Sequence, residues 1–171
     1  KQMGVVCAGG AGFPPHVKAG SRAEVILANG AECEPLLHKD LELMVRYAPE
    51  ICAGLERMAG VTGAQSVKFG VKEKNKRAVE KVTPEVQRRG WGMVLLGDFY
   101  PSGDEYELVY AGTGRLIPAG GIPLQVGCVV NNVETLYNVE MAAQGQPVTR
   151  KFLTVTGAVR KPQSFWAPVG I

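Results

Sequence analysis

The hydrophobic and polar positions along the chain alternate between two patterns. Short, mostly apolar runs predict four buried strands, at 23–28, 66–71, 93–96 and 127–130. Segments with apolar residues every three or four positions predict helices, at 41–58, 74–82, 103–110 and 132–143. Because each strand is followed by a helix, the pattern predicts an α/β fold with a mostly parallel sheet and helices on both of its faces.

Two prolines fall inside the helical segments. Pro49 interrupts the first helical pattern and predicts a split into two helices, because proline lacks the N–H that a continuous helix uses. Thr83 and Pro84 predict a new helix start, with Thr83 as the N-cap and Pro84 at the first helical position. Gly90 is expected to end that helix.

The pattern changes after Pro147. Apolar residues then occupy one face of a period-two pattern, at Leu153, Val155 and Val159, and threonines occupy the other, at Thr154 and Thr156. This alternation predicts a strand of a different module. We therefore expect one complete α/β domain over residues 1–148 and the start of a truncated β domain over residues 149–171.

Composition narrows the class of protein. The chain has 171 residues, of which 46% are hydrophobic and 20% charged, which is typical of a folded domain. The net charge of +3 is too small to indicate nucleic-acid binding. No apolar run approaches the ~18 residues of a membrane span, so no direct membrane insertion is expected. Four scattered cysteines without a CxxC pair argue against an iron–sulfur or zinc site within these residues and indicate reduced thiols in the cytoplasm.

Four polar loops carry the candidate chemistry: AGGAGFP at 8–14, NGAECEP at 29–35, YPSGDE at 100–105 and VNNVET at 130–135. The last three follow predicted strands, and a parallel sheet brings such loops to one edge, where α/β proteins bind ligands. Taken singly, each loop has a simpler interpretation: a tight turn, exposed loop acids, acids in a first helical turn, or an Asn N-cap. Taken together, glycine-rich amides and a helix start with Asn132 and Thr135 suit a phosphate group.

These four segments, in this order and with Lys18 after the first, resemble the flavin-binding 51 kDa subunit of respiratory complex I and its relatives. Within this family, the motif sequences are most similar to those of the RnfC-like branch and, within that branch, to the cobalamin reductases of propanediol-utilising bacteria. The segments that carry this likeness are NGAECEPLLHKD, GDEYELVYAGTGRLIPAGGIPLQVG and VVNNVETLYNV. The tail FLTVTGAVRKP resembles the lead into the SLBB (β-grasp-like) domain of the family. The resemblance implies a Rossmann-like sheet of the kind that binds FMN in complex I.

The resemblance also implies non-covalent FMN that accepts a hydride from NADH. Carried over residue by residue, the FMN contacts are Gly9, Gly10, Gly12, Lys18, Asn29, Glu32, Cys33, Tyr100, Gly103, Asp104, Val130, Asn131, Asn132 and Thr135. The NADH contacts are Phe13, Glu34 and Glu105. No catalytic acid or base and no metal ligand is implied within this chain, and iron–sulfur clusters are expected only beyond residue 171. The expected partners are NADH and a downstream acceptor, either cobalamin or a membrane electron-transfer complex, with the protein in the cytoplasm, associated with a membrane through partners or enclosed in a bacterial microcompartment.

The chain departs from the complex I pattern at several positions. Ala31 replaces an acid, Cys33 replaces a serine, and the segment 116–123 replaces the loop that complex I uses around NADH. Two other functions therefore remain open. The domain could be a scaffold that keeps the fold without binding a nucleotide, or a cobalamin-binding module in which His16 or His38 coordinates cobalt.

Overall fold

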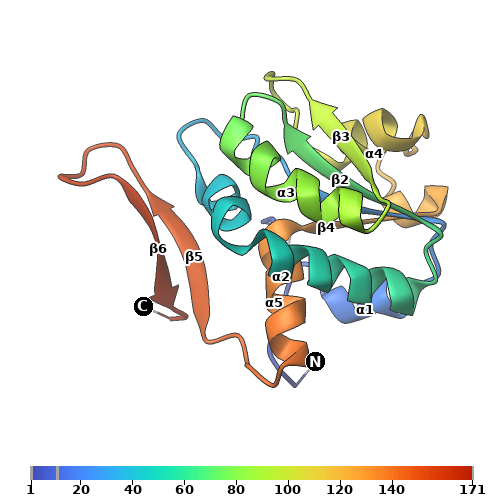
Figure 1. Cartoon of the computed structure of the whole chain (residues 1–171), viewed down its shortest axis with the longest axis horizontal. Coiled ribbons are helices and arrows are strands. Elements are labelled where there is room, and N and C mark those ends of the chain that lie inside the picture. The colour runs from blue at the N-terminus through green and yellow to red at the C-terminus, as the bar shows by residue number, and fades with distance from the viewer. Residues whose placement is uncertain (1, 11, 171) are drawn as a thin grey trace.

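A four-stranded parallel sheet forms the centre of the molecule (Figure 1). The computed structural model describes residues 2–10 and 12–170, so Ala11 of the glycine-rich loop lies outside the described residues. The strands are β1 (Val25–Gly30), β2 (Ser66–Lys72), β3 (Gly92–Leu96) and β4 (Cys128–Asn132). They lie side by side in the order β3-β2-β1-β4, with Ile26 of β1 opposite Val67 on one side and Val129 on the other. The predicted parallel sheet is confirmed.

Helices cover both faces of this sheet, as predicted. One face packs against α2 (Lys39–Thr62), α3 (Lys76–Arg88) and α5 (Val133–Ala143), with α1 (Pro15–Ala19) beside α2. The other face packs against α4 (Glu105–Thr113) and the short 3-10 helix η1 (Pro123–Val126). Side chains such as Ile51 and Leu55 fill the first layer and Leu108 fills the second, all without solvent exposure. Burial on both faces explains why the strands read as apolar runs rather than as alternating patterns.

The strand order places a reversal between β1 and β4. From β1 the chain moves outward through β2 to β3, and it then crosses back to add β4 on the other side of β1. Open parallel sheets bind ligands at such a reversal, beyond the carboxyl ends of the two strands. Here the residues at those two ends are Asn29 and Gly30 on β1 and Asn131 and Asn132 on β4.

Pro49 acts as predicted, and Pro84 does not. The α2 segment consists of two helical parts that meet at a kink, where Tyr47 has non-helical angles (φ −134°, ψ 31°), two positions before Pro49. The prediction of a helix start at Thr83 is wrong, because α3 runs through Pro84 without a break. Its buried residues Ala78, Val82 and Val86 continue at steps of four across the proline, so packing on the sheet outweighs the lost hydrogen bond.

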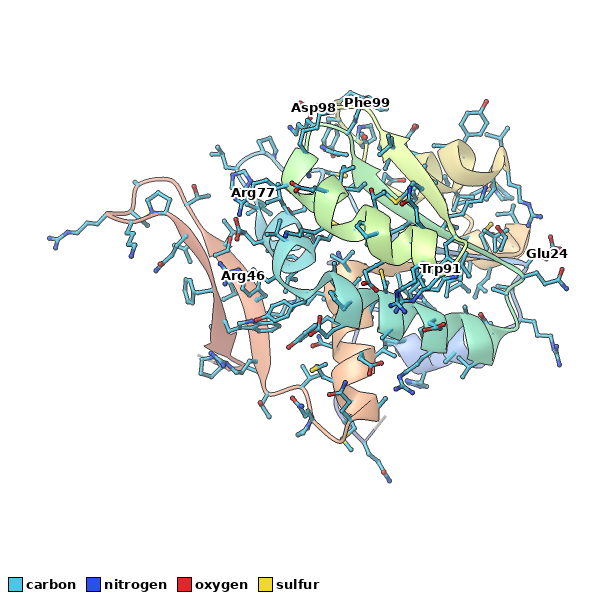
Figure 2. All side chains as sticks on the ribbon, viewed as in Figure 1. Glu24, Arg46, Arg77, Trp91, Asp98 and Phe99 are labelled. Atoms are coloured by element: carbon cyan, nitrogen blue, oxygen red, sulfur yellow. The ribbon has the colours of Figure 1, made fainter. Side chains whose placement is uncertain are left out.

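The tail forms an antiparallel hairpin of β5 (Arg150–Val155) and β6 (Gln163–Pro168). The face that meets the helices carries Phe152, which is fully buried in the main core, and Trp166, whose ring centroid lies 5.1 Å from that of Phe152. Arg46 of α2 points toward the hairpin (Figure 2), and its guanidinium carbon lies 5.6 Å from the centroid of the Phe152 ring. The strand is confirmed, but Val159 lies in the connecting loop rather than on the strand.

None of the helices among the described residues is long and apolar enough to cross a membrane.

Candidate functional site

The glycine-rich loop is folded back on itself and held against α5. The N–H of Cys7 donates to the carbonyl of Phe13 at 3.0 Å, which closes the loop at its base. Gly10 (φ 107°) and Gly12 (φ 61°) adopt backbone angles that side chains disfavour, and no atom lies within 4 Å of where their Cβ atoms would be. The N–H of Ala8 donates to Oγ1 of Thr135 at 2.9 Å, so α5 fixes the position of the loop.

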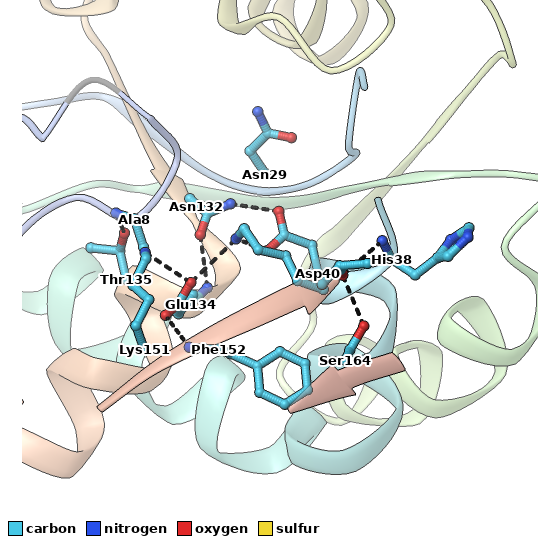
Figure 3. Close-up of polar contacts among 12 residues, drawn as sticks. Ala8, Asn29, His38, Asp40, Asn132, Glu134, Thr135, Lys151, Phe152 and Ser164 are labelled. Atoms are coloured by element: carbon cyan, nitrogen blue, oxygen red, sulfur yellow. Dashed lines mark hydrogen bonds and ion pairs between the residues drawn. The ribbon is translucent and has the colours of Figure 1, made fainter. Parts of the chain in front are cut away.

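Asn132 is the N-cap of α5, which is the simpler of the two interpretations that the sequence offered. Its Oδ1 accepts from the N–H of Glu134 at 2.9 Å, and its Nδ2 donates to Asp40 at 2.7 Å (Figure 3). A Cβ at Gly9 would lie 3.2 Å from the Cβ of Asn132. Glycine at this position therefore lets the loop rest directly on the capping residue.

Lys18 links α1 to the carboxyl end of β4. Its Nζ donates to the carbonyl of Val130 at 2.6 Å and lies 5.4 Å from the centroid of the Phe13 ring. Glu105, in the first turn of α4, is close enough to interact with this cation. Burial raises the pKa of Glu105, and the charge of Lys18 opposes that rise. The structure thus groups Phe13, Lys18, Val130 and Glu105, which lie far apart in the sequence.

The loops that follow β1 and β3 are bound to each other. The Nδ2 of Asn29 donates to the carbonyl of Gly103 at 2.8 Å, and its Oδ1 accepts from the N–H of Ala31 at 3.0 Å. The thiol of Cys33 lies 3.5 Å from the carbonyl oxygen of Pro101. Asn29 therefore does more than line the site, since its side chain sets the spacing between the two loops.

A cavity of about 330 Å³ opens beside these two loops, at the carboxyl ends of the strands. Glu32, Cys33, Glu34 and Tyr100 line it together with Lys72. Burial and the charge of Glu34 raise the pKa of the Cys33 thiol, which favours its neutral form. The side chains that the resemblance assigned to the flavin and to NADH are thus mixed along this cavity.

Asp104 and Tyr100 complete the loop after β3. The carboxylate of Asp104 accepts from the N–H of Tyr106 at 2.8 Å and so caps α4, while Tyr100 is 80% exposed. Asp98 and Phe99 lie at the same end of the sheet (Figure 2). The hydroxyl of Tyr106 donates to the carbonyl of Gly121 at 2.7 Å, which anchors the segment 116–123 to α4.

Glu32 is a carboxyl group at this cavity whose pKa is strongly altered by its surroundings. Burial, followed by the charge of Asp40, raises the pKa of Glu32 to about 7. Its Oε1 is buried and has no hydrogen-bond partner among the described residues. A carboxyl group at the rim of a ligand site with a pKa near neutrality is typical of functional sites.

Asn131 is the clearest sign of an absent partner. Its side chain is 1% exposed, and neither Oδ1 nor Nδ2 has a hydrogen-bond partner among the described residues. Leaving such a group unpaired costs about 1–3 kcal/mol, so native proteins rarely do so. Asn131 stands at the strand reversal, between Val130, whose carbonyl accepts from Lys18, and Asn132, on which Gly9 rests. The open glycine backbone, the cation and the unpaired amide together fit a flat polar ring with a phosphate tail.

Sequence reasoning missed three charged residues that support this site, the buried carboxylates Asp40 and Glu134 and the partly buried Lys39. Lys39 lies 2.6 Å from Asp40 and 3.2 Å from Glu134, and Glu134 is fully buried. All three belong to the segments that carried the resemblance, HKD and NNVETL. A hydrophobic pattern treats charged residues as exposed, so it could not predict that these residues lie inside the protein. Among the described residues, no three His, Cys, Asp or Glu side chains come together as metal ligands would.

His38 lies where the start of α2 meets the hairpin, and its backbone N–H donates to Oγ1 of Thr154.

Comparison with known proteins places this geometry in a family. The model of the Nuo51 FMN-binding domain matches residues 1–141. The cobalamin reductase PduS is 43% identical over the whole chain in both Citrobacter freundii and Salmonella typhimurium. A component of an ion-translocating oxidoreductase complex from Vibrio cholerae is 35% identical over 99% of the chain. The chain spans 38% of the length of the two reductases and 23% of the Vibrio protein.

Solved structures agree with this assignment. An NAD⁺-reducing [NiFe]-hydrogenase in its air-oxidised state superposes with a TM-score of 0.83 at 25% identity, over 99% of this chain and 35% of that chain. The H₂-reduced state of such an enzyme, at 24% identity and a TM-score of 0.79, supports the fold. Since the family model covers most of its residues, the chain belongs to the family of complex I 51 kDa subunits, by way of their Nuo51 FMN-binding domain.

Proposed function

We propose that this chain binds FMN and NADH and forms the electron-input module of a larger oxidoreductase. The observation that carries the proposal is the buried, unpaired amide of Asn131. It stands at the strand reversal, next to Val130, whose carbonyl accepts from Lys18, in a chain of the FMN-binding family. A scaffold domain without a ligand would gain nothing from a buried amide that no group satisfies.

The residues divide into groups that suit different parts of FMN. The phosphate and ribityl chain meet the glycine-rich loop, Lys18 and the start of α5, where free amides and the helix dipole favour an anion. The residues at the carboxyl ends of β1 and β4 would hold the ring, and the side chain of Asn131 would offer it both a donor and an acceptor. The loops at 29–33 and 100–104 border it. Bound FMN supplies the capacity to take a hydride and to release electrons one at a time.

NADH approaches from the solvent side, near Phe13, Glu34 and Glu105. The aromatic ring of Phe13 offers a stacking surface, and the carboxylates offer acceptors for ribose hydroxyl groups. The nicotinamide must come within about 3–3.5 Å of the acceptor for hydride transfer. No acid or base of this chain has to move a proton in that step, so these residues orient the nucleotide and exclude water.

The rest of the proposal concerns the whole protein. Electrons pass to iron–sulfur clusters outside these residues and then to cobalamin or to a membrane electron-transfer complex, as the names of the relatives suggest. Residues 149–171 begin the β domain that follows. We place the protein in the cytoplasm, either free, bound to membrane partners or in a microcompartment.

Flavin titration tests the central claim. FMN fluorescence should be quenched with saturation near one equivalent, and Asn131→Ala should weaken binding about tenfold, which corresponds to one lost buried hydrogen bond. The control is Asn138→Ala, which changes a buried asparagine of α5 and should bind FMN like the parent chain. Absence of quenching at about 100 μM protein would support the scaffold function instead.

Reduction assays test the electron path once FMN is saturating. NADH should drive reduction of ferricyanide or a dye, which takes electrons directly from reduced flavin. Cobalamin should be reduced slowly, or not at all, compared with a full-length protein that carries cluster cysteines. Cobalamin reduction by this chain at the full-length rate would contradict the proposed relay.

A further inference from the structure

Both ends of the Asn132 side chain are held within the protein. Its Oδ1 accepts from the N–H of Glu134, and its Nδ2 donates to Oδ2 of Asp40 (Figure 3). With both ends held, this amide has one orientation. It can serve as the rigid support under Gly9, whose missing Cβ would be 3.2 Å away.

Asp40 is itself fixed from several directions. It is 4% exposed, and its second oxygen, Oδ1, accepts from Nζ of Lys39 at 2.6 Å. The same ammonium lies 3.2 Å from Oε2 of Glu134. Two short contacts leave neither oxygen of Asp40 free to bind a ligand, so Asp40 acts through its neighbours.

Glu134 ties this group to the hairpin. Its Oε1 accepts from the N–H of Phe152 at 3.1 Å, and its Oε2 lies 3.2 Å from Nζ of Lys151 (Figure 3). The carboxylates of Asp40 and Glu134 are thus balanced by the ammonium groups of Lys39 and Lys151. Each oxygen of these two carboxylates has a hydrogen-bond donor. A buried polar network that is fully satisfied restricts the structure to one arrangement.

We propose that Asp40 is a positioning residue for the glycine-rich loop: it orients Asn132, on which Gly9 rests, and thereby presets the loop for the phosphate side of the ligand. The ligand part of this inference rests on the proposed function. The loop part concerns the protein alone. Ala8, next to Gly9, provides the probe, because its N–H bonds to Thr135 one turn further along α5.

Asp40→Asn is the primary test, since it keeps the shape of the side chain. The new amide has one acceptor for two donors, so it must lose either Asn132 or Lys39. Hydrogen exchange at the amide of Ala8, measured by NMR without ligand, should become about tenfold faster, the factor that one net hydrogen bond is worth. FMN affinity should fall by a similar factor.

Glu140→Gln is the matched control. Glu140 is 5% exposed and pairs with Arg57 at 2.6 Å, so it joins α5 to α2 like the contact of Asp40, but near the other end of α5. This variant should leave exchange at Ala8 within about twofold of the parent. Equal acceleration in both variants would show a general loosening between the helices and would overturn the proposal.

Reversing the hydrogen bond provides a rescue. Combining Asp40→Asn with Asn132→Asp lets the amide at position 40 donate to a carboxylate that still caps α5. Exchange at Ala8 should return to within about threefold of the parent, whereas no recovery would overturn the proposal. If Asp40→Asn does not fold, Asn132→Ser, which keeps the cap but cannot reach Asp40, should give the same acceleration.

Failure of the proposed FMN binding can be distinguished from failure of the positioning role of Asp40. If the parent chain does not bind FMN, the proposed function fails, and the exchange results still decide the role of Asp40. If FMN binds the parent and exchange accelerates in Asp40→Asn without loss of FMN affinity, Asp40 does not position the loop for the ligand, and the proposal fails.

Discussion

Gly103 lies directly against the backbone of Ala31. A Cβ at Gly103 would be 2.0 Å from the carbonyl oxygen of Ala31 and 2.9 Å from the sulfur of Cys33. The loops after β1 and β3 could separate to make room for a Cβ only by breaking the hydrogen bond from Asn29 to Gly103. The absence of a side chain at Gly103 therefore allows the two loops of the candidate site to pack together.

Gly103→Ala should therefore damage the site more than the rest of the fold. We expect a loss of about 1–3 kcal/mol in the free energy of unfolding, typical of an overpacked position, together with weaker FMN binding. Urea unfolding and flavin titration measure the two effects. Gly60→Ala is the control, because Gly60 is exposed in α2 with no atom within 4 Å, and alanine should stabilise that helix by up to about 1 kcal/mol.

The sheet was predictable because both of its faces are covered. Apolar runs such as 25–28 then stand out from the helices around them, and β1 occupies Val25–Gly30 in the structure. Pro84 shows where local rules fail. Its position predicted a helix start, but Val82 and Val86 bury their side chains on either side of it, and tertiary packing keeps the helix continuous.

The candidate site was predictable in outline and not in detail. Glycines, asparagines and acids at strand ends indicated which loops would meet. Sequence alone could not show that Asn132 faces Asp40 while its neighbour Asn131 is left unpaired, because that difference depends on which way each side chain points at the end of β4. The hairpin is similar: Phe152 is the buried residue, while the predicted apolar face carries Val155, which is exposed.

Glu32 predicts a pH dependence of stability. Its pKa rises from 4.5 to about 7 on burial near Asp40, so the folded chain binds this proton more tightly than the unfolded chain. The stabilisation is complete below pH 4.5 and is lost as the pH rises through 7, and it amounts to about 3 kcal/mol. Urea unfolding of the parent and of Glu32→Gln between pH 4.5 and 8 measures the difference. Parallel pH profiles for the two proteins would contradict a raised pKa.

Phe152 predicts how firmly the hairpin belongs to the α/β domain. It has no solvent exposure, so Phe152→Ala should lower the free energy of unfolding by about 3–5 kcal/mol, as in a domain core. Phe165, on the other face of the same hairpin, is 37% exposed and is the matched control. Its replacement by alanine should cost less than half as much. Similar small losses in both variants would mean that the hairpin rests loosely on the helices.

Glu105 tests how the site is divided between the two nucleotides. It lies in the first turn of α4, half-buried and near Lys18, and we place it on the NADH side. Glu105→Gln keeps the shape but removes the charge that accepts ribose hydroxyl groups, so the KM for NADH should rise about tenfold while the Kd for FMN stays within about twofold. Glu107→Gln, in the same first turn, is the control and should change neither value. Both constants are measured in the dye-reduction assay and by flavin titration. If Glu105→Gln instead loses FMN and keeps its response to NADH, this carboxylate borders the flavin, and the assignment of Phe13 beside it to NADH must be reversed as well.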